Sequence, residues 1–385
     1  MDTWKKFKND PLALSGLFII FFLVFLAVSA PLIANEKPLL LYVNGHLSSP
    51  AFSELFTPES PEIFVEKSWN FLLLFLPCSI VLFLTGKLFS SAKRKKYYQY
   101  SFVIVFLLLL LPFVLTGSRI DKTPWREMTA KLKSPDFALY APIPYGPFEM
   151  ADAPYEKSSF RHLAGTDQSG RDVLARMIYG SRVSLSVGFC ATLLSLFLGT
   201  LAGLVCGYLG GKTDLFLMRF VEIVICFPTF LLLLILMTIL LDYGSRQSIL
   251  LVIIVLGLTS WTTLARLIRG ETLKQRKMAY IQSCECMGVP VYKILFLHLL
   301  PNVSGPVFVT FTFEVAGAVL AESSLSFLGF GVQDPTASWG ELLRQAYPDP
   351  LSYSHLMFYP GLAIFLTVCA FNFAGEGLRK ALNGK

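Results

Sequence analysis

The sequence predicts an all-α protein, a polytopic bundle with about eight transmembrane helices. Hydrophobic residues make up 54% of the 385 residues and charged residues only 15%, whereas soluble proteins average about 25% charged residues. The mean hydropathy is +0.59. Apolar runs near the roughly 20 residues that a helix needs to cross a bilayer recur along the chain. These three observations exclude a soluble domain and predict an integral membrane protein.

Eight apolar runs are long enough to span the membrane. In chain order they are Leu12–Ile33, Trp69–Gly86, Tyr100–Gly117, Val183–Leu209, Phe220–Leu241, Ser248–Leu264, Val303–Phe327 and Leu356–Phe373. The first run follows lysines, as in a signal peptide. However, it has full spanning length and no Ala-x-Ala cleavage pattern closes it, so we expect an uncleaved anchor.

The basic residues predict the orientation. An even number of spans places both termini on one side, and the basic N-terminus favours the cytoplasm. More than half of the 33 lysines and arginines fall in the tails and loops that this orientation assigns to the cytoplasm, and the short outer loops hold few. The net charge of +7 therefore reflects membrane topology, and we expect contact with lipid but no nucleic-acid partner.

The runs divide the chain into five regions. We expect a cytosolic tail with the first span at 1–34, an outer loop at 35–68, a transmembrane hairpin at 69–117, an outer segment at 118–181 and the main helical domain at 182–382. The hairpin looks like an insertion. Its basic turn, Ser91–Lys96, we interpret as a topology anchor rather than as a lipid-specific site.

A polar, basic loop between two spans, residues 271–302, carries the most specific local signal. Its periodicity predicts about three helical turns over Lys277–Met287, with Tyr280, Cys284 and Met287 on one face. The predicted cytosolic position of this loop suits a docking surface better than a catalytic site.

Two breaker residues shape this loop into an elbow. Gly288 supplies a left-handed stop, and Pro290 prevents the first helix from continuing. A second short helix, Val291–Leu300, is then expected to leave at an angle and to end before Pro301. A rigid elbow presented crosswise to a partner can transmit a rigid-body movement; a surface loop with incidental helicity is the alternative.

Three glycines mark a helix face for close packing. Gly199, Gly203 and Gly207 recur at intervals of four within one span, so a neighbouring backbone can approach them closely. A substrate path along the same face is the alternative interpretation.

Three carboxylates lie in or at the edge of apolar runs, where an unpaired charge costs at least about 2.5 kcal/mol. Glu222 lies near Arg219, which favours an ion pair at the membrane boundary. Glu314 and Glu322 are eight residues apart and share roughly one helix face, so they are candidates to line a translocation path or to carry protons. The alternative is that each caps or pairs with another helix.

We expect no catalytic, cofactor or metal site in this chain. Gly210–Thr213 resembles the end of a phosphate-binding P-loop, but the spacing fails because Cys206 stands where the first glycine should be. Cys284 and Cys286 lack a second pair of zinc ligands. The four histidines are scattered over separate loops: His46, His162, His298 and His355. Any energy from ATP must therefore come from a partner.

Several blocks in the second part of the chain occur in an order that matches a known family. They are His162–Asp172, Gly207–Gly211 with Asp214 and Arg219, Phe227–Pro228, Ala265–Arg266 with Arg269–Gly270, the 271–302 loop, Ala321–Gly329, Ser338–Gly340 and Tyr359–Gly361. On these blocks, which cover most of 160–382, the chain resembles the inner-membrane permeases of ATP-binding-cassette (ABC) importers. The closest resemblance is to the second permease, the C subunit, of dipeptide and oligopeptide systems.

The resemblance implies a type I ABC importer permease fold in the bacterial cytoplasmic (inner) membrane, to which the hairpin is extra. It also implies a second homologous permease subunit, two ABC ATPase subunits that bind ATP and magnesium, an external substrate-binding protein and a peptide substrate. Related systems carry nickel or other small solutes. A proton-coupled secondary transporter that uses Glu314 or Glu322 is a further alternative, and a polytopic membrane enzyme is a third.

In that family the elbow is the coupling helix that sits in a groove of the ATPase. The resemblance therefore implies a coupling role for Ala279, Tyr280, Gln282, Ser283, Cys284, Gly288, Leu300 and Pro301. The family's Glu-Ala-Ala opening is replaced by Gln282-Ser283-Cys284, whereas Gly288 and Leu300-Pro301 stand at the expected offsets. Glu322 matches a family position and Glu314 does not.

Overall fold

Six helices of the computed structural model are long and apolar enough to cross a membrane. They are α2 (Pro11–Ile33), α4 (Ile63–Gly86), α7 (Val173–Leu209), α10 (Ile249–Arg276), α13 (Leu300–Phe327, helical from Val291) and α15 (Ser354–Asn383). The structure describes residues 2–87, 91–117, 123, 125–132, 136–150, 152–242 and 249–383. Within the described residues, each of these six helices contains one of the predicted apolar runs. The prediction of a helical membrane fold is therefore confirmed.

The predicted run Phe220–Leu241 is not a single helix, so the expectation of one helix here is wrong. The helices α8 (Gly211–Ile225) and α9 (Thr229–Asp242) meet at 85°. Pro228 accounts for the break, because proline has no N–H and disfavours helical geometry in the residue before it. The eighth run lies in α5 (Ser91–Leu115), whose apolar part, Tyr100–Leu115, is shorter than the other spans. The count of eight is thus approximate.

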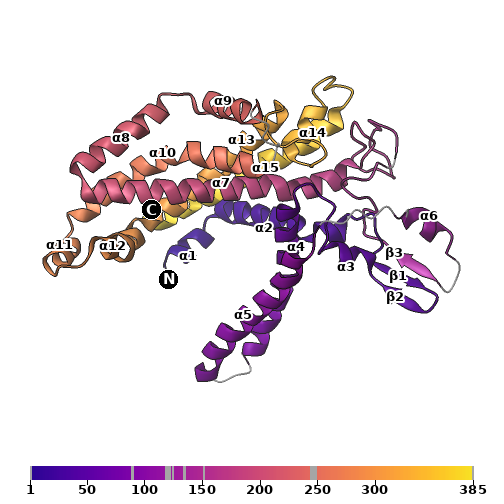
Figure 1. Ribbon diagram of the computed structural model, residues 1–385, viewed down its shortest axis with the longest axis horizontal. Helices are drawn as coiled ribbons and strands as arrows, with labels where there is room; N and C mark the ends of the chain where they lie inside the picture. The colour runs from indigo at the N-terminus through magenta and orange to yellow at the C-terminus, as the bar shows by residue number, and fades with distance from the viewer. Residues whose placement is uncertain are drawn as a thin grey trace.

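The bundle is built around the long helix α7, which packs along α10 and also contacts α13 and α2 (Figure 1). α15 packs between α2 and α13, and α1 (Asp2–Lys8) rests on α15. An ion pair between Lys380 and Asp10, 3.0 Å apart, joins the two ends of the chain. Both termini therefore lie near one end of the bundle (Figure 1).

Short elements cover the opposite end of the bundle. A three-stranded antiparallel sheet has the order β2-β1-β3, formed by β1 (Leu40–Val43), β2 (His46–Ser48) and β3 (Phe137–Leu139). The helices α3 (Pro50–Glu54), α6 (Trp125–Ala130) and α14 (Trp339–Gln345) lie at the same end (Figure 1). We expected only irregular loops here, because strands of three or four residues are too short to show an alternating pattern.

The helices α4 and α5 form a hairpin that projects from the bundle (Figure 1). Aromatic rings hold its two helices together; Phe75 and Phe106 meet edge to face at 5.8 Å. At its base, the buried Arg182 of α7 donates to Glu66 and, at 2.9 Å, to the amide oxygen of Asn70. The segment predicted as the basic turn, Ser91–Lys96, is instead the beginning of α5, and its side chains lie outside the described residues.

The three glycines of α7 face α10. A Cβ atom at Gly199 would lie 2.7 Å from the carbonyl oxygen of Trp261, and one at Gly203 would lie 2.7 Å from that of Ala265. Gly207 is equally close to α10, 2.6 Å from Cβ of Thr272. Because no side chain fits into these gaps, the two helices approach each other closely over two turns of α7.

Candidate functional site

The predicted elbow lies at the end of the bundle that also holds the chain termini (Figure 1). Its first helix, α11 (Ala279–Cys286), is anchored by two buried side chains, Ile281 and Cys284. They pack in one apolar cluster with Leu204 of α7 and Ile268 of α10. The first helix of the elbow is therefore packed directly against α7 and α10.

Gly288 ends α11 in a Schellman motif. Its φ of +69° is in the left-handed region, which favours glycine. The amide of Gly288 donates to the carbonyl of Glu285 at 3.0 Å, and the amide of Val289 donates to that of Cys284 at 3.0 Å. Val289 then packs on the same apolar cluster as Cys284, as is usual for this motif. The turn is thus fixed by backbone geometry and by burial together.

The exposed surface of α11 differs from the predicted one. Ala279, Gln282 and Ser283 are exposed, whereas Cys284 is 6% exposed and unavailable to a partner. Met287 was expected to share a face with Cys284, but it is 72% exposed, because the helix ends before it and the chain turns away. Tyr280 is half-buried and donates a hydrogen bond to Oε1 of Gln275 at 2.9 Å.

The second part of the elbow does not stop at Pro301, so that prediction is wrong. The chain is helical without interruption from α12 (Val291–Lys293) through a π-helical segment, η1 (Ile294–Leu299), into α13. The wider π turn lets the amide of Leu300 reach the carbonyl of Leu295, and Pro301, which has no N–H to donate, follows directly without ending the helix. Pro301 itself is exposed, and Leu300 packs partly on the apolar cluster.

A cavity of about 450 Å³ lies among α7, α9, α10 and α13. Serine and threonine side chains from all four helices line it, among them Ser195, Thr229, Thr259 and Thr310. Glu314 is the only ionisable residue among the described residues of this lining, and it accepts a hydrogen bond from Ser195 at 3.0 Å. Hydroxyl groups suit polar solutes because each can both donate and accept a hydrogen bond.

The other two membrane carboxylates lie elsewhere. Glu322 is fully buried and accepts hydrogen bonds from Ser326 at 2.8 Å and from Ser184 at 3.1 Å, so it joins α13 to α7 outside the cavity. Glu222 pairs with Arg219 at 2.7 Å on the exposed face of α8, as expected for a boundary ion pair.

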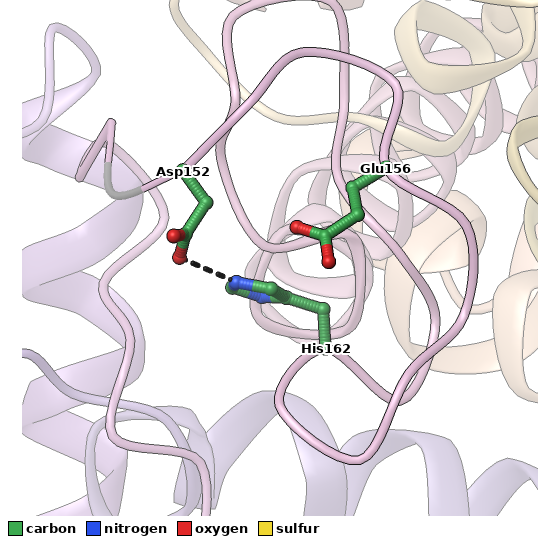
Figure 2. Close-up of side chains that lie close together, drawn as sticks. All are labelled: Asp152, Glu156 and His162. Atoms are coloured by element: carbon green, nitrogen blue, oxygen red, sulfur yellow. Dashed lines mark hydrogen bonds and ion pairs between the residues drawn. The ribbon is translucent and has the colours of Figure 1, made fainter.

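A cluster of ionisable groups at the sheet end was not expected from the sequence. Donor atoms of Asp152, Glu156 and His162 lie within 4.8 Å of one another, a spacing that a metal ion can bridge (Figure 2). The imidazole is already engaged on both sides, with Nε2 2.8 Å from Asp152 and Nδ1 2.8 Å from Asp172. We interpret this cluster as a clamp that holds the outer loop. The histidines are scattered along the sequence, and folding of the loop brings carboxylates to one of them, which histidine spacing alone does not reveal.

Buried arginines extend the clamp to α14. Arg171 bonds to Asp167 at 2.7 Å, and Arg176 bonds to Glu341 of α14 at 2.7 Å. All four side chains are nearly or fully buried, so each charge depends on its partner. Arg176 of α7 and Glu341 of α14 are 165 residues apart, and neither residue shows in the sequence that the two will pair.

Comparison with known proteins decides the family. Residues 199–385 match the family model described as binding-protein-dependent transport system inner membrane component, and residues 1–49 match that of the N-terminal TM domain of oligopeptide transport permease C. The glutathione transport system permease protein GsiD of Pectobacterium atrosepticum is 34% identical over 282 residues, which are 69% of this chain and 92% of that protein.

The chain belongs to this permease family. Two further relatives agree. The oligopeptide transport system permease protein OppC of Haemophilus influenzae is 42% identical over 58% of this chain and 70% of its own length. The dipeptide transport system permease protein DppC of Bacillus subtilis is 40% identical over 58% of this chain and 69% of its own length.

Membership of the family confirms the resemblance seen in the sequence and makes the chain an ABC importer permease. The relatives are transport permeases, which agrees with a subunit that moves a solute rather than one that catalyses a reaction. The projecting hairpin, α4 with α5, lies between the two segments that the family models match.

Proposed function

We propose that this chain is one of two permease subunits that import peptides across the bacterial cytoplasmic membrane at the expense of ATP. Two of the relatives described above are permeases for dipeptides or oligopeptides, and the third is a permease for glutathione, itself a peptide. The remaining parts are a second homologous permease, two ATPase subunits that bind ATP and magnesium, and an external binding protein that delivers the peptide.

The packing of α11 is the observation that carries the coupling mechanism. The helix presents Ala279, Gln282 and Ser283 outward, and it buries Ile281 against the ends of α7 and α10. ATP binding draws the two ATPases together, and each carries its coupling helix with it. Because α7 and α10 form two walls of the cavity, movement of α11 opens the cavity to one side of the membrane or the other.

A second link strengthens this connection. Arg269, near the elbow end of α10, binds Asp214 at the start of α8 through both carboxylate oxygens, with one N···O distance of 2.6 Å. A bidentate pair of this kind fixes geometry as well as distance. The elbow therefore moves α8, and with it the broken crossing that leads into α9, together with α10.

Gly288 provides a sharp test in the transporter reconstituted in proteoliposomes, with the two permeases, the two ATPase subunits and the binding protein present. Replacing Gly288 by Val forces a β-branched residue into the left-handed region and disturbs the end of α11, whereas Gly288→Asn keeps a residue that tolerates this region. We expect Gly288→Val to lower both peptide-stimulated ATP hydrolysis and uptake by at least about tenfold. A tenfold loss corresponds to about 1.4 kcal/mol, which is the scale of strain for a residue with a Cβ in the left-handed region.

The matched variant, Gly288→Asn, should retain most of both activities. No side chain or backbone atom lies within 4 Å of a Cβ built at this position, so any difference between the two variants reflects backbone conformation and not crowding. Uptake by the wild-type complex that needs no ATPase subunit, or that a proton uncoupler alone abolishes, would contradict the proposed function.

A further inference from the structure

The hydroxyl-lined cavity contains one carboxylate, Glu314, and the described residues of its lining include no cationic side chain. Glu314 is half-buried in the middle of α13, and Ser195 is the only described residue that donates a hydrogen bond to it. Of its two carboxylate oxygens, Oε2 accepts this bond, which leaves Oε1 without a donor among the described residues. No described lysine, arginine or histidine lines the cavity.

A second polar group in the same wall also lacks a partner. Thr192 lies three residues before Ser195 on α7, so both side chains are on one face of the helix. Its side chain is 1% exposed, and its Oγ1 has no hydrogen-bond partner. A buried hydroxyl without a partner is unfavourable, so it marks a place where a polar ligand gains a hydrogen bond.

Charge then selects the ligand. A carboxylate inside the membrane is stabilised by an approaching cation and repels an anion. Peptides carry a cationic ammonium at one end and an anionic carboxylate at the other, and only the ammonium, with three N–H donors, matches an acceptor such as Oε1. The cavity volume of about 450 Å³ is within the range of about 300–1,000 Å³ that is usual for small-molecule sites.

We propose that Glu314, with Ser195 and Thr192, forms a recognition site for the α-ammonium group of the peptide during its passage. This inference rests on the proposed function. Such a site would let the permease itself distinguish peptides, independently of the binding protein. A peptide with a charged amino terminus would neutralise the Glu314 carboxylate inside the membrane, whereas one without it would not.

The test uses the complete transporter in proteoliposomes and two probes, tri-alanine and N-acetyl-tri-alanine, which differ in one positive charge. The affinity of the binding protein for each probe is measured first, so that uptake is compared at equal occupancy. We expect the wild type to import tri-alanine about tenfold faster than its acetylated form, since a hydrogen bond to a charged group contributes about that factor or more.

Glu314→Gln should lower uptake of tri-alanine about tenfold and leave uptake of N-acetyl-tri-alanine within about twofold, so that the discrimination disappears. Glu314→Asp keeps the charge and should therefore retain part of the discrimination between the two probes. Thr192→Val keeps the shape of the side chain and should lower uptake of tri-alanine by less than Glu314→Gln does, and leave uptake of N-acetyl-tri-alanine unchanged. Glu222→Gln is the matched control, because Glu222 is exposed, pairs with Arg219 and lies outside the cavity.

The outcomes separate the two proposals. Equal loss of both probes in Glu314→Gln overturns the inference, because a carboxylate that carries protons or holds helices together does not distinguish the two amino termini. Equal uptake of both probes by the wild type overturns it as well. If the wild-type complex shows no ATP-dependent uptake of either probe, the proposed function itself fails, and the recognition site fails with it.

Discussion

At the scale of single residues, the sheet end of the molecule holds several buried acidic groups whose pKa values are shifted. Glu36, Glu54 and Glu149 all have raised pKa values, chiefly because burial disfavours the charged carboxylate. For Glu36 the neighbouring charge of Glu54 adds to burial, and its pKa is raised to about 7. Lys37 opposes this shift, but it also pairs with Glu59 at 3.0 Å. The folded state is therefore favoured when Glu36 is protonated.

This arrangement predicts a stability that falls as pH rises. The folded protein keeps the proton on Glu36 up to about pH 7, whereas the unfolded chain releases it near pH 4.5. The folded state therefore binds more protons between these values, and the free energy of unfolding decreases across that window, by up to about 3 kcal/mol. Thermal unfolding of the detergent-solubilised protein from pH 5 to pH 8 measures the effect.

Glu36→Gln is the corresponding variant. It should unfold at a higher temperature than the wild type at pH 8 and show a flatter dependence on pH, with the remaining slope due to Glu54 and Glu149. Parallel curves for the two proteins would show that Glu36 titrates as an ordinary exposed carboxyl group.

At the scale of secondary-structure elements, the contact between α7 and α10 depends on absent side chains. A Cβ at Gly203 would lie 2.7 Å both from the carbonyl oxygen of Ala265 and from Cβ of Ile268. We predict that Gly203→Ala separates the helices and destabilises the protein by about 1–3 kcal/mol, the usual cost of overpacking. The measurement is the temperature of half-inactivation of peptide-stimulated ATP hydrolysis in the assembled transporter.

Gly270→Ala is the control in the facing helix. Nothing lies within 4 Å of a Cβ at this position, so alanine should raise stability by about 0.5–1 kcal/mol through its better helix propensity. A Gly203→Ala protein as heat-stable as the wild type would contradict the close packing of α7 against α10 at this position.

These elements also show what the sequence can and cannot predict. Apolar length alone places the spanning helices, because the bilayer demands about 20 apolar residues whatever their neighbours are. Prolines were harder to interpret. Pro228 breaks its crossing, whereas Pro301 is absorbed by the π turn before it, since tertiary packing decides whether the chain bends at a missing N–H.

The candidate site was predicted to a similar extent. The elbow and its glycine stop follow from local chemistry, and Glu314 stands out because a charge in an apolar run is costly. The burial of Cys284 and the hydroxyl lining depend on which helices meet, and no isolated threonine such as Thr192 signals that. The clamp around His162 was missed for the same reason: it joins loop residues without any periodic spacing.

At the scale of the whole molecule, the length of the helices separates two functional ends. α7 has 37 residues, and at 1.5 Å per residue it is about 55 Å long, well beyond the roughly 30 Å hydrocarbon core of a bilayer. The elbow and the chain termini lie at one end of the bundle, and the sheet with the clamp lies at the other (Figure 1). Because α7 is longer than the bilayer is thick, we expect these two ends on opposite faces of the membrane. The distribution of basic residues favours the cytoplasm for the elbow.

Thiol labelling decides this orientation. Cys286 is exposed on α11 and is a natural probe for the elbow, and Phe160, fully exposed in the outer loop, is replaced by cysteine as the matched probe. Each is kept as the only cysteine of its variant. A membrane-impermeant maleimide should label Cys286 in inverted vesicles but not in intact spheroplasts, and should label the Phe160→Cys variant in spheroplasts alone. Because the proposed ATPase subunits would cover α11, their addition to the inverted vesicles should slow the labelling of Cys286. Labelling of Cys286 from outside the cell would invert the topology and place the elbow where no ATPase can reach it.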